Sequence, residues 1–315
     1  MTRHLNLIAR SNGVGLDRDV DLIRESAHAA GYRVTFSHCR AISPLARFLP
    51  GTPRFDANLF LERIFPRWLS TAPINLLIPN QERFPERHLP RLRKIDHVFC
   101  KSHHALEIFQ KHHPSCLFTG FTSKDLFDPD IPKKEKSFLH LAGRSTLKGT
   151  EAILALWKKH PEWPKLTLLQ HPENAPADLP ANVHLIRDYL SEQDLRKLIN
   201  EHAIHLCPSL SEGWGHYIVE AMSCGAVVIT TDGPPMHELV QPDRGLLVEV
   251  GHSGPRHLGV NYHVDANSLE ATIARSLALP PEKIKQLGTS ARDWFVQNHH
   301  DFQRRFLKAL ADTFS

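Results

Sequence analysis

The sequence predicts an α/β protein made of two successive, doubly wound domains. Short apolar segments alternate with helical segments from residue 5 to about residue 121, which is typical of a parallel sheet. The same alternation starts again at residue 138, after a polar, proline-bearing segment at 128–137 that we expect to be a linker. A chain of 315 residues also suits two domains of about 150 residues each.

The first domain opens with a strand, a loop, a helix and a second strand. These are expected at "LNLIAR", "SNGVG", "LDRDVDLIRESAHAAG" and "YRVTFSH", and Gly31 closes the helix. Four further strands are expected at "ANLFLERI", "INLLIPN", "HVFCKS" and "CLFTGF".

The second domain opens in the same order. A strand is expected at "FLHLAG", a loop at "RSTLKG" and a helix at "TEAILALWKKH". Four more strands follow at "KLTLLQ", "VHLI", "IHLCPS" and "AVVITTD", and the stretch "SARDWFVQNHHDFQRRFLKALADTF" predicts a long amphipathic helix or a helix pair. The two domains are expected to face each other across a cleft, with ligands at the carboxyl ends of the strands.

Composition narrows the class of protein. The formal charge of +4 fits a phosphorylated ligand or an anionic surface and does not require nucleic acid. No run of about 18 apolar residues predicts a membrane span, and "MTRHLNLIAR" is too short and too polar for a signal peptide. The five dispersed cysteines predict reduced thiols in a cytoplasmic protein.

Metal-binding patterns are weak. The 22 histidines include three adjacent pairs, but their spacing resembles no zinc site, so we interpret them as surface and pocket residues. Three Asp-x-Asp triplets occur, at 17–19, 19–21 and 128–130. The first two fall in the first turn of a helix, where the helix dipole favours acids, and the third falls in the linker. We therefore expect no metal.

The stretch "LSEGWGHYIVEAMSCGAVVITTDG", residues 210–233, holds Glu212 in a glycine-bearing loop and Glu220 in the helix that follows. Helical side chains lean toward the helix N-terminus, so Glu220 is expected to look back toward Glu212, and both carboxylates to reach one ligand. Gly213 and Gly215 permit close backbone approach, and the amides at 215–218 are expected to face an anion. The alternative makes Glu212 a solvated loop residue and Glu220 a helix-surface residue.

The loop "LAGRSTLKGTEAI" adds two cations. Arg144 and Lys148 lie between a strand and a helix N-terminus, flanked by Gly143 and Gly149. Two cations beside free amides favour a diphosphate. The order of residues is not that of a Walker A loop.

The loop "SNGVG" is a weaker signal. A dinucleotide fingerprint needs a small residue where Arg18 stands and an acid after the second strand, where "SHCR" stands. NAD binding is therefore disfavoured. Gly13 and Gly15 instead predict backbone that closes on a ligand held by the second domain, or a simple tight turn.

These segments together resemble the retaining family-4 glycosyltransferases with the GT-B fold, over about residues 138–250. "GRSTLK-G" and the E-x7-E pair Glu212 and Glu220 carry the resemblance. It implies an acceptor-side domain at 1–130, a nucleotide-sugar-binding domain at 131–290 and a helix at 291–315 that crosses back to the first domain. It also implies a metal-independent transfer from a nucleotide-diphosphate sugar, which is the donor substrate and not a cofactor.

The resemblance implies a role for each site residue. Arg144 and Lys148 would hold the diphosphate, and Glu212 would contact hydroxyl groups of the transferred sugar. Glu220 would hold the ribose hydroxyls. The remaining donor contacts would come from the backbone of Gly213, Trp214, Gly215, His216 and Tyr217, from the base-packing pair Tyr189 and Leu190, and from Gly13 and Gly15.

Two departures from the family leave its contacts open. His216 and Tyr217 stand where the family has apolar residues, which allows a changed sugar contact. The family often places a histidine after its fourth strand, where this chain has "IPNQERF", so Asn80, Gln81 or Glu82 occupies the acceptor-orienting region.

The acceptor itself is open: a glycan, a lipid-linked sugar, a protein or a small molecule. The stretch 46–69 mixes arginines with aromatic residues, and the stretch 82–94 is a basic run. Three interpretations are open for these stretches. They could contact the inner membrane face, they could bind a charged acceptor, or they could form a core strand and a solvated loop. A non-catalytic nucleotide-sugar-binding subunit, or an inactive partner of another transferase, is the alternative to an enzyme.

Overall fold

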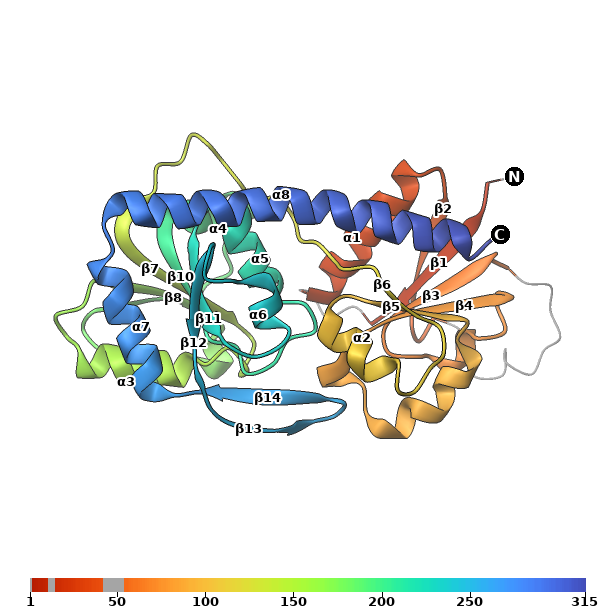
Figure 1. Ribbon diagram of the computed structural model, residues 1–315, viewed down its shortest axis with the longest axis horizontal. Helices are drawn as coiled ribbons and strands as arrows, with labels where there is room; N and C mark the ends of the chain where they lie inside the picture. The colour runs from red at the N-terminus through yellow and green to blue at the C-terminus, as the bar shows by residue number, and fades with distance from the viewer. Residues whose placement is uncertain (1, 11–14, 42–53) are drawn as a thin grey trace. The chain divides into compact units, whose positions relative to one another are not determined.

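The computed structural model describes residues 2–10, 15–41 and 54–315, and the chain forms two compact units (Figure 1). Unit 1 comprises Met1–Ser123, Pro255–Gly259 and Asn298–Ser315, and unit 2 comprises Lys124–Gly254 and Val260–Gln297. Each unit is built on its own six-stranded parallel sheet. The predicted α/β class, with two successive doubly wound halves, is confirmed.

Unit 1 has the six strands that the sequence predicts. They run in the spatial order β2-β1-β3-β4-β5-β6, so the order reverses between β1 and β3. Apolar side chains fill both faces of the central strands, and every residue of β3 is buried. The strands are β1 (His4–Ala9), β2 (Arg33–His38), β3 (Ala57–Glu62), β4 (Ile74–Pro79), β5 (His97–Cys100) and β6 (Cys116–Phe118).

The helical segments of unit 1 follow the strands. α1 (Gly15–Ala29) carries Asp17 in its first turn, and α2 (His103–Phe109) begins at a Ser102 side chain that accepts the Ala105 amide. Short 3-10 segments follow β3 and β4, and they are η2 (Pro66–Trp68), η3 (Gln81–Arg83) and η4 (Glu86–Lys94).

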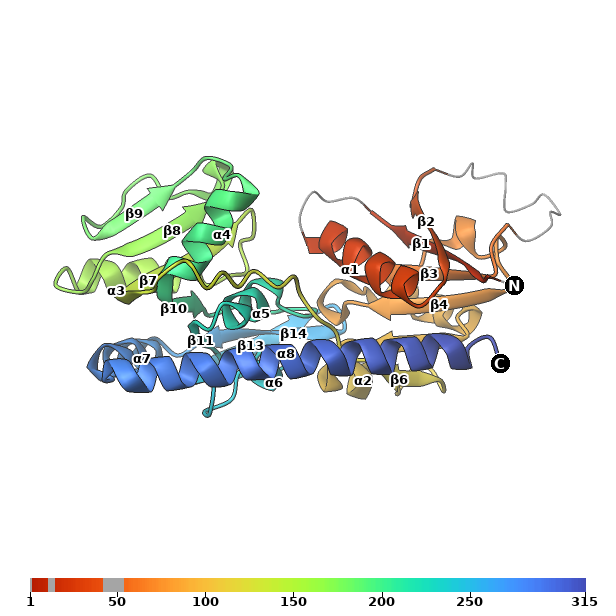
Figure 2. The same cartoon turned by 90° about the horizontal axis from the view of Figure 1, so that it is seen from above.

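Unit 2 has the spatial strand order β12-β11-β10-β7-β8-β9, which reverses between β10 and β7. Figure 2 shows β9, β8, β7, β10 and β11 in that succession. The strands are β7 (Lys134–Gly143), β8 (Leu166–Gln170), β9 (Val183–Ile186), β10 (His202–Cys207), β11 (Val227–Thr231) and β12 (Gly245–Val248).

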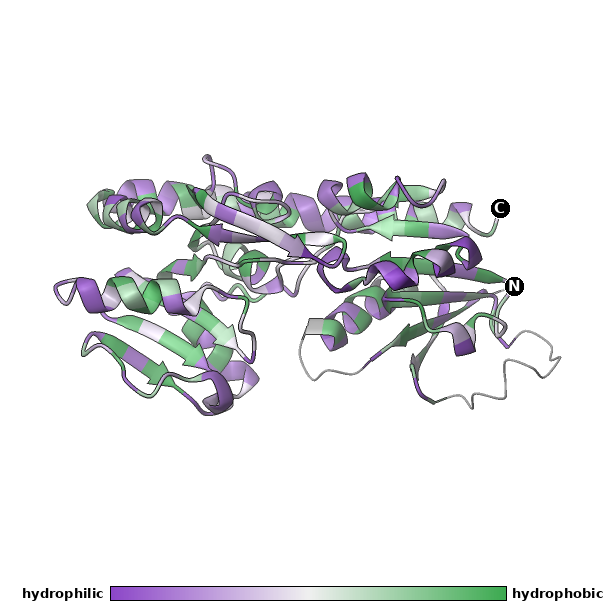
Figure 3. Cartoon of the chain, turned by 90° about the horizontal axis from the view of Figure 1, so that it is seen from below, coloured by the Kyte–Doolittle hydropathy of each residue, from purple (hydrophilic) through white to green (hydrophobic). Residues whose placement is uncertain are grey.

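One expectation for this region was wrong, and three strands were not predicted. The linker at 128–137 ends early, because β7 already begins at Lys134, which pairs with His202 of β10. The strands that were not predicted are β12 and the two strands of a ribbon, β13 (Val250–Arg256) and β14 (Gly259–Val264). That ribbon is coloured mainly hydrophilic to neutral in Figure 3, whereas the sheet strands are mainly hydrophobic.

The helices of unit 2 pack around a core that includes Phe138, Trp157 and Trp163, whose rings meet edge to face. These helices are α3 (Thr150–Lys159), α4 (Glu192–Glu201), α5 (His216–Ser223), α6 (Met236–Leu239), α7 (Ala266–Ala278) and the first part of α8 (Pro281–Asp312), with the 3-10 segment η5 (Pro172–Asn174) after β8.

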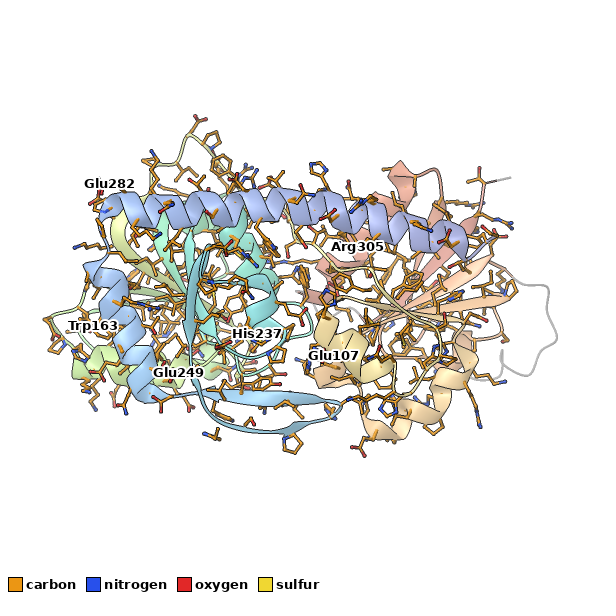
Figure 4. The ribbon with its side chains drawn as sticks, viewed as in Figure 1. Glu107, Trp163, His237, Glu249, Glu282 and Arg305 are labelled. Atoms are coloured by element: carbon orange, nitrogen blue, oxygen red, sulfur yellow. The ribbon has the colours of Figure 1, made fainter. Side chains whose placement is uncertain are left out.

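The predicted C-terminal helix or helix pair is one continuous helix, α8, of 32 residues. Figure 4 labels Glu282 near its start, in unit 2, and Arg305 toward its end, in unit 1. In unit 1, Phe302 and Phe306 of α8 are fully buried, and the Arg305 Nε donates to the Thr119 carbonyl oxygen at 3.2 Å. Within the described ranges, α8 included, no helix is long and apolar enough to cross a membrane.

Candidate functional site

The candidate site lies where the strand order of unit 2 reverses. The loop after β7, residues 144–149, and the loop after β10, residues 208–215, leave neighbouring strands at the same carboxyl edge. At such a point the helices that follow the two strands leave on opposite faces of the sheet, and open parallel sheets bind ligands there. The two loops are the ones that the sequence predicts to carry the chemistry.

The two loops are held against each other by their backbones. The Leu210 amide donates to the Leu147 carbonyl oxygen at 2.9 Å. Gly149, with φ +73°, lies so close to Pro208 that a Cβ would overlap the Pro208 carbonyl oxygen. A side chain at position 149 would therefore be strained by the left-handed backbone and would also push the loops apart.

Lys148 meets Glu212 across this contact. Its Nζ lies 2.5 Å from Glu212 Oε1 and 3.8 Å from the centroid of the Tyr217 ring. The lysine and glutamate side chains are only 17% and 13% exposed. Residues 64 positions apart in sequence thus form a mostly buried charge pair at the edge of the sheet.

Ser209 and Tyr217 hold the Glu212 carboxylate through two successive hydrogen bonds. Ser209 Oγ donates to Glu212 Oε1 at 2.5 Å and lies 2.5 Å from the Tyr217 hydroxyl. Because the single Ser209 proton goes to the carboxylate, the Tyr217 hydroxyl must donate to Ser209. Burial raises the pKa of Tyr217 well above its usual value, so the phenol keeps that proton.

His140 is buried beside Thr150, the first residue of α3, and sequence reasoning missed it. Its Nδ1 lies 2.7 Å from the Leu206 carbonyl oxygen and its Nε2 lies 2.9 Å from Thr150 Oγ1. Since a carbonyl only accepts, Nδ1 carries the proton and Nε2 accepts from the hydroxyl group. Burial, with the Lys148 charge as a minor cause, lowers the pKa of His140 to about 4, so the imidazole is neutral at pH 7.

Helix α5 holds the second glutamate. Glu220 is 3% exposed, so the interpretation of this residue as part of the helix surface is wrong. Gly215, with φ +101°, precedes the helix, and its carbonyl oxygen accepts the amides of Ile218 and Val219. The expectation that the amide of residue 218 faces a ligand is therefore also wrong, because the first turn of the helix uses it.

The structure places the other predicted residues of unit 2 in two environments. Around the loop after β10, Gly213 and Trp214 are buried and His216 is partly exposed. After β9, Tyr189 is 96% exposed, whereas Leu190 packs on a small apolar cluster with Leu139 and Leu198. Base packing by Tyr189 and Leu190 stays a prediction.

Arg144 contacts residues of the loop after β8. Its Nη2 is 3.0 Å from His171 Nε2, and its carbonyl oxygen accepts from Asn174 Nδ2 at 2.9 Å. The guanidinium group is exposed. The loop after β8 therefore orients Arg144, and no feature of the sequence indicated His171 as its neighbour.

Tyr262, a tyrosine of β14, contacts the loop after β10. The Tyr262 amide donates to the Leu210 carbonyl oxygen at 2.7 Å, and a Cβ on Gly233 would come within 2.8 Å of the Tyr262 ring. Burial raises the pKa of Tyr262. Sequence reasoning missed this residue because it assigned no strand to 259–264.

Unit 1 offers polar groups at its own carboxyl edge. Gly13 lies outside the described residues, and Gly15 is the first residue of α1. Asn80 follows β4, next to Gln81 and Glu82, both buried, and its Oδ1 is buried without a hydrogen-bond partner among the described atoms. On the neighbouring strand Glu62 has φ +69°, a conformation that costs free energy in a residue other than glycine.

The described part of the chain shows no cluster of three or more His, Cys, Asp or Glu residues that could hold a metal ion. In the first Asp-x-Asp triplets, Asp19 forms a buried ion pair at 2.6 Å with Lys101, and Asp21 pairs with Arg24. Asp19 and Asp21 therefore have a structural role as partners in ion pairs.

Comparison with known proteins adds the family context. Residues 174–258, which include Glu212 and Glu220, match the family model described as "Glycosyl transferases group 1". The chain is 26% identical to the alpha-maltose-1-phosphate synthase of Mycolicibacterium smegmatis over 172 residues, which cover 52% of this chain and 41% of that protein. The chain spans less than half the length of the curated relatives it matches.

Solved structures match over the whole chain. A glycosyltransferase from Rickettsia africae superposes with a TM-score of 0.75 at 12% identity, covering 100% of this chain and 99% of that one. The Anabaena protein HepE in complex with UDP and glucose gives a TM-score of 0.70 at 14% identity, covering 98% and 100%. This chain therefore has the GT-B type of α/β fold.

Proposed function

We propose that this protein is a retaining, metal-independent glycosyltransferase that moves a sugar from a nucleotide-diphosphate sugar to an acceptor. The Lys148–Glu212 pair, held by two loops where the strand order reverses in unit 2, carries the proposal. The match of residues 174–258 to a glycosyltransferase family supports it, as does the UDP and glucose bound by a protein of the same fold.

Lys148 is the group that would stabilise the departing diphosphate. Its ammonium group has three hydrogens, one of which Glu212 can accept, so donors remain for phosphate oxygens. The pair is mostly buried, and electrostatic stabilisation of developing charge is strongest where water is excluded. Transfer with retention would proceed by attack of the acceptor on the face that the diphosphate leaves, with the phosphate taking the acceptor proton.

The carboxylates would orient the donor. Glu212 keeps one oxygen on Lys148 and Ser209 and can accept sugar hydroxyls with the other. Glu220, buried on α5, would accept from the ribose hydroxyls. Arg144, exposed beside His171, would add a second cation to the diphosphate when the donor binds.

His140 would act by position and not by proton transfer. A pKa of about 4 keeps it neutral at pH 7, and both ring nitrogens are occupied by Leu206 and Thr150. A neutral imidazole adds no competing charge beside Lys148. It instead fixes the start of α3, the helix whose first turn follows the cationic loop.

Release of nucleotide diphosphate from UDP-, GDP-, ADP- and TDP-sugars tests the proposal. We expect slow, acceptor-independent hydrolysis of one donor, retained in EDTA. Lys148→Ala should lower its rate about a hundredfold, equivalent to about 3 kcal/mol, because a charge-assisted contact to the leaving group is lost. Lys158→Ala, an exposed lysine on α3, is the matched control and should retain the wild-type rate.

A double variant, Lys148→Ala with Glu212→Gln, separates the effect of Lys148 on the reaction rate from its effect on the charge of the site. Lys148→Ala leaves the Glu212 carboxylate uncompensated, and that charge repels the diphosphate. Adding Glu212→Gln to Lys148→Ala should therefore recover part of the lost donor binding but not the rate. Binding of a nucleotide without release or transfer, with any acceptor tried, would favour a non-catalytic nucleotide-sugar-binding subunit. Loss of all activity in EDTA would contradict metal independence.

A further inference from the structure

A hollow of about 240 Å³ lies at the carboxyl edge of the unit 1 sheet. Three arginines from three different strand ends line it: Arg10 follows β1, Arg40 follows β2 and Arg67 lies in η2, after β3. Cys39, Phe65 and Pro66 complete the lining. The function proposed above leaves these residues unused, since it rests on unit 2.

Hydrogen bonds join described residues next to each of the three arginines. The Cys39 amide donates to the Ala9 carbonyl oxygen at 2.9 Å, which holds the positions of Arg10 and Arg40 together. The Trp68 Nε1 donates to the Cys39 carbonyl oxygen at 3.2 Å, which draws η2 and Arg67 to the same place. The three cations therefore converge because of the fold, although their side chains are exposed.

No carboxylate in the described ranges balances these charges. The ion pairs of unit 1 use other arginines, such as Arg3 with Asp56 and Arg63 with Glu62. Residues 1, 11–14 and 42–53 contain no Asp or Glu, so the remaining segments add no acid. Three guanidinium groups around one hollow repel one another unless an anion lies between them.

The location is the second reason for a ligand. The strand order of unit 1 reverses between β1 and β3, and Arg10 and Arg67 follow these two strands. This is the position at which an open parallel sheet binds ligands. We propose that this hollow binds a phosphate or carboxylate group of the acceptor, which makes the acceptor an anionic sugar or sugar derivative.

The chemistry of the lining fits such a group. Guanidinium forks bind phosphate and carboxylate oxygens through paired hydrogen bonds. Phe65 and Pro66 offer apolar surface for the carbon face of a sugar ring, next to the cations. The hollow of about 240 Å³ has room for one charged group with part of a sugar ring. The assignment of the ligand as the acceptor rests on the proposed function, whereas the anion site stands on its own geometry.

Calorimetric titration of the full chain with glucose 6-phosphate, glucuronate, inorganic phosphate and glucose tests this inference. We expect the anions to bind at least tenfold more tightly than glucose, and binding to weaken as NaCl rises from about 0.05 to about 0.3 M. Arg40→Gln and Arg67→Gln should each weaken anion binding at least tenfold, and Arg40→Lys should weaken it less. Arg33→Gln, an exposed arginine at the amino end of β2, is the matched control.

A lipid headgroup could supply the same anionic group. A second experiment therefore measures sedimentation of the protein with vesicles containing phosphatidylglycerol. Sedimentation that depends on Arg40 and Arg67 would support the anion site and identify its source as a headgroup. Equal binding of glucose and its phosphate, or anion binding unaffected by Arg40→Gln and Arg67→Gln in folded protein, would overturn the inference. If the wild-type protein releases nucleotide but binds no anion, only the anion site is rejected. If it binds anions through these arginines but binds no nucleotide, only the proposed function is rejected.

Discussion

At the scale of single residues, the site depends on which groups carry charge. Lys148 and Glu212 form the charged pair, while the groups around them are neutral: Tyr217 keeps its proton and His140 is a neutral imidazole. Burial reinforces both neutral states, because removing water from an ionised side chain costs several kcal/mol. A diphosphate would therefore meet one cation that no neighbouring imidazolium or phenolate disturbs.

Buried neutral histidines make stability depend on pH. Burial lowers the pKa of His140 to about 4 and that of His205 to about 3, whereas the unfolded side chains titrate near 6.5. Between these values the unfolded chain binds more protons, so the stability contribution is complete above about pH 6.5 and is lost as pH falls toward 4.

Urea unfolding at pH 7.5, 6.0 and 5.0 checks this effect. His140→Gln, which can keep the hydrogen bonds but cannot titrate, should reduce the pH slope by one proton, or about 1.4 kcal/mol per pH unit. Identical slopes in wild type and variant would show that His140 is already protonated in the folded protein.

The residues of the site show what a sequence can and cannot reveal. The spacing of Glu212 and Glu220 and the position of Lys148 before a helix follow from local pattern, so the sequence indicated all three. The contact between Lys148 and Glu212 joins loops 64 residues apart, and local pattern contains no information on it. His140 looks like any polar residue in an apolar strand, and only its burial beside Thr150 distinguishes it.

At the scale of elements, the packing of α8 in unit 2 includes a close contact between two glycine backbones. Gly288 of α8 lies against Gly225, in the turn between α5 and β11, so that a Cβ on Gly288 would overlap the Gly225 carbonyl oxygen. Gly225 itself has φ +66°. Two glycines thus let the helix reach the backbone that follows α5, the helix that carries Glu220.

Gly288→Ala tests this packing. Alanine favours an isolated helix by about 0.5–1 kcal/mol over glycine, yet we expect it to destabilise this protein by about 1–3 kcal/mol, because the helix must move off the turn. Thr289→Ala, at the neighbouring exposed position, should be neutral or slightly stabilising. Thermal unfolding of both variants gives the comparison, and a stabilised Gly288→Ala protein would show that the contact has room for a methyl group.

Elements were predictable where burial is regular. Strands buried on both faces are continuous apolar segments, and the predicted strands of both sheets lie at the expected places. The ribbon β13–β14 has polar residues, glycines and a proline without periodicity, so its sequence resembles a loop. β12 is a short strand at the edge of its sheet, and its pairing with β11 depends on the tertiary fold.

At the scale of the whole molecule, the sequence implied the fold class because the strand–helix alternation occurs twice. Strand order was not visible in the sequence, yet it decides where ligands bind. The order reverses at β10/β7 in unit 2 and at β1/β3 in unit 1, and the charge pair and the arginine hollow lie at these two points. Each unit thus contributes one candidate binding site to the proposed transfer.

We expect unit 2 to bind a nucleotide diphosphate through Lys148. Calorimetric titration of the wild-type chain with UDP, GDP, ADP and TDP, in EDTA, tests it most directly. One of these nucleotides should bind without metal, Lys148→Ala should weaken its binding at least tenfold, and Lys158→Ala should not. Failure of the folded protein to bind any of the four nucleotides would show that unit 2 is not a nucleotide-diphosphate site.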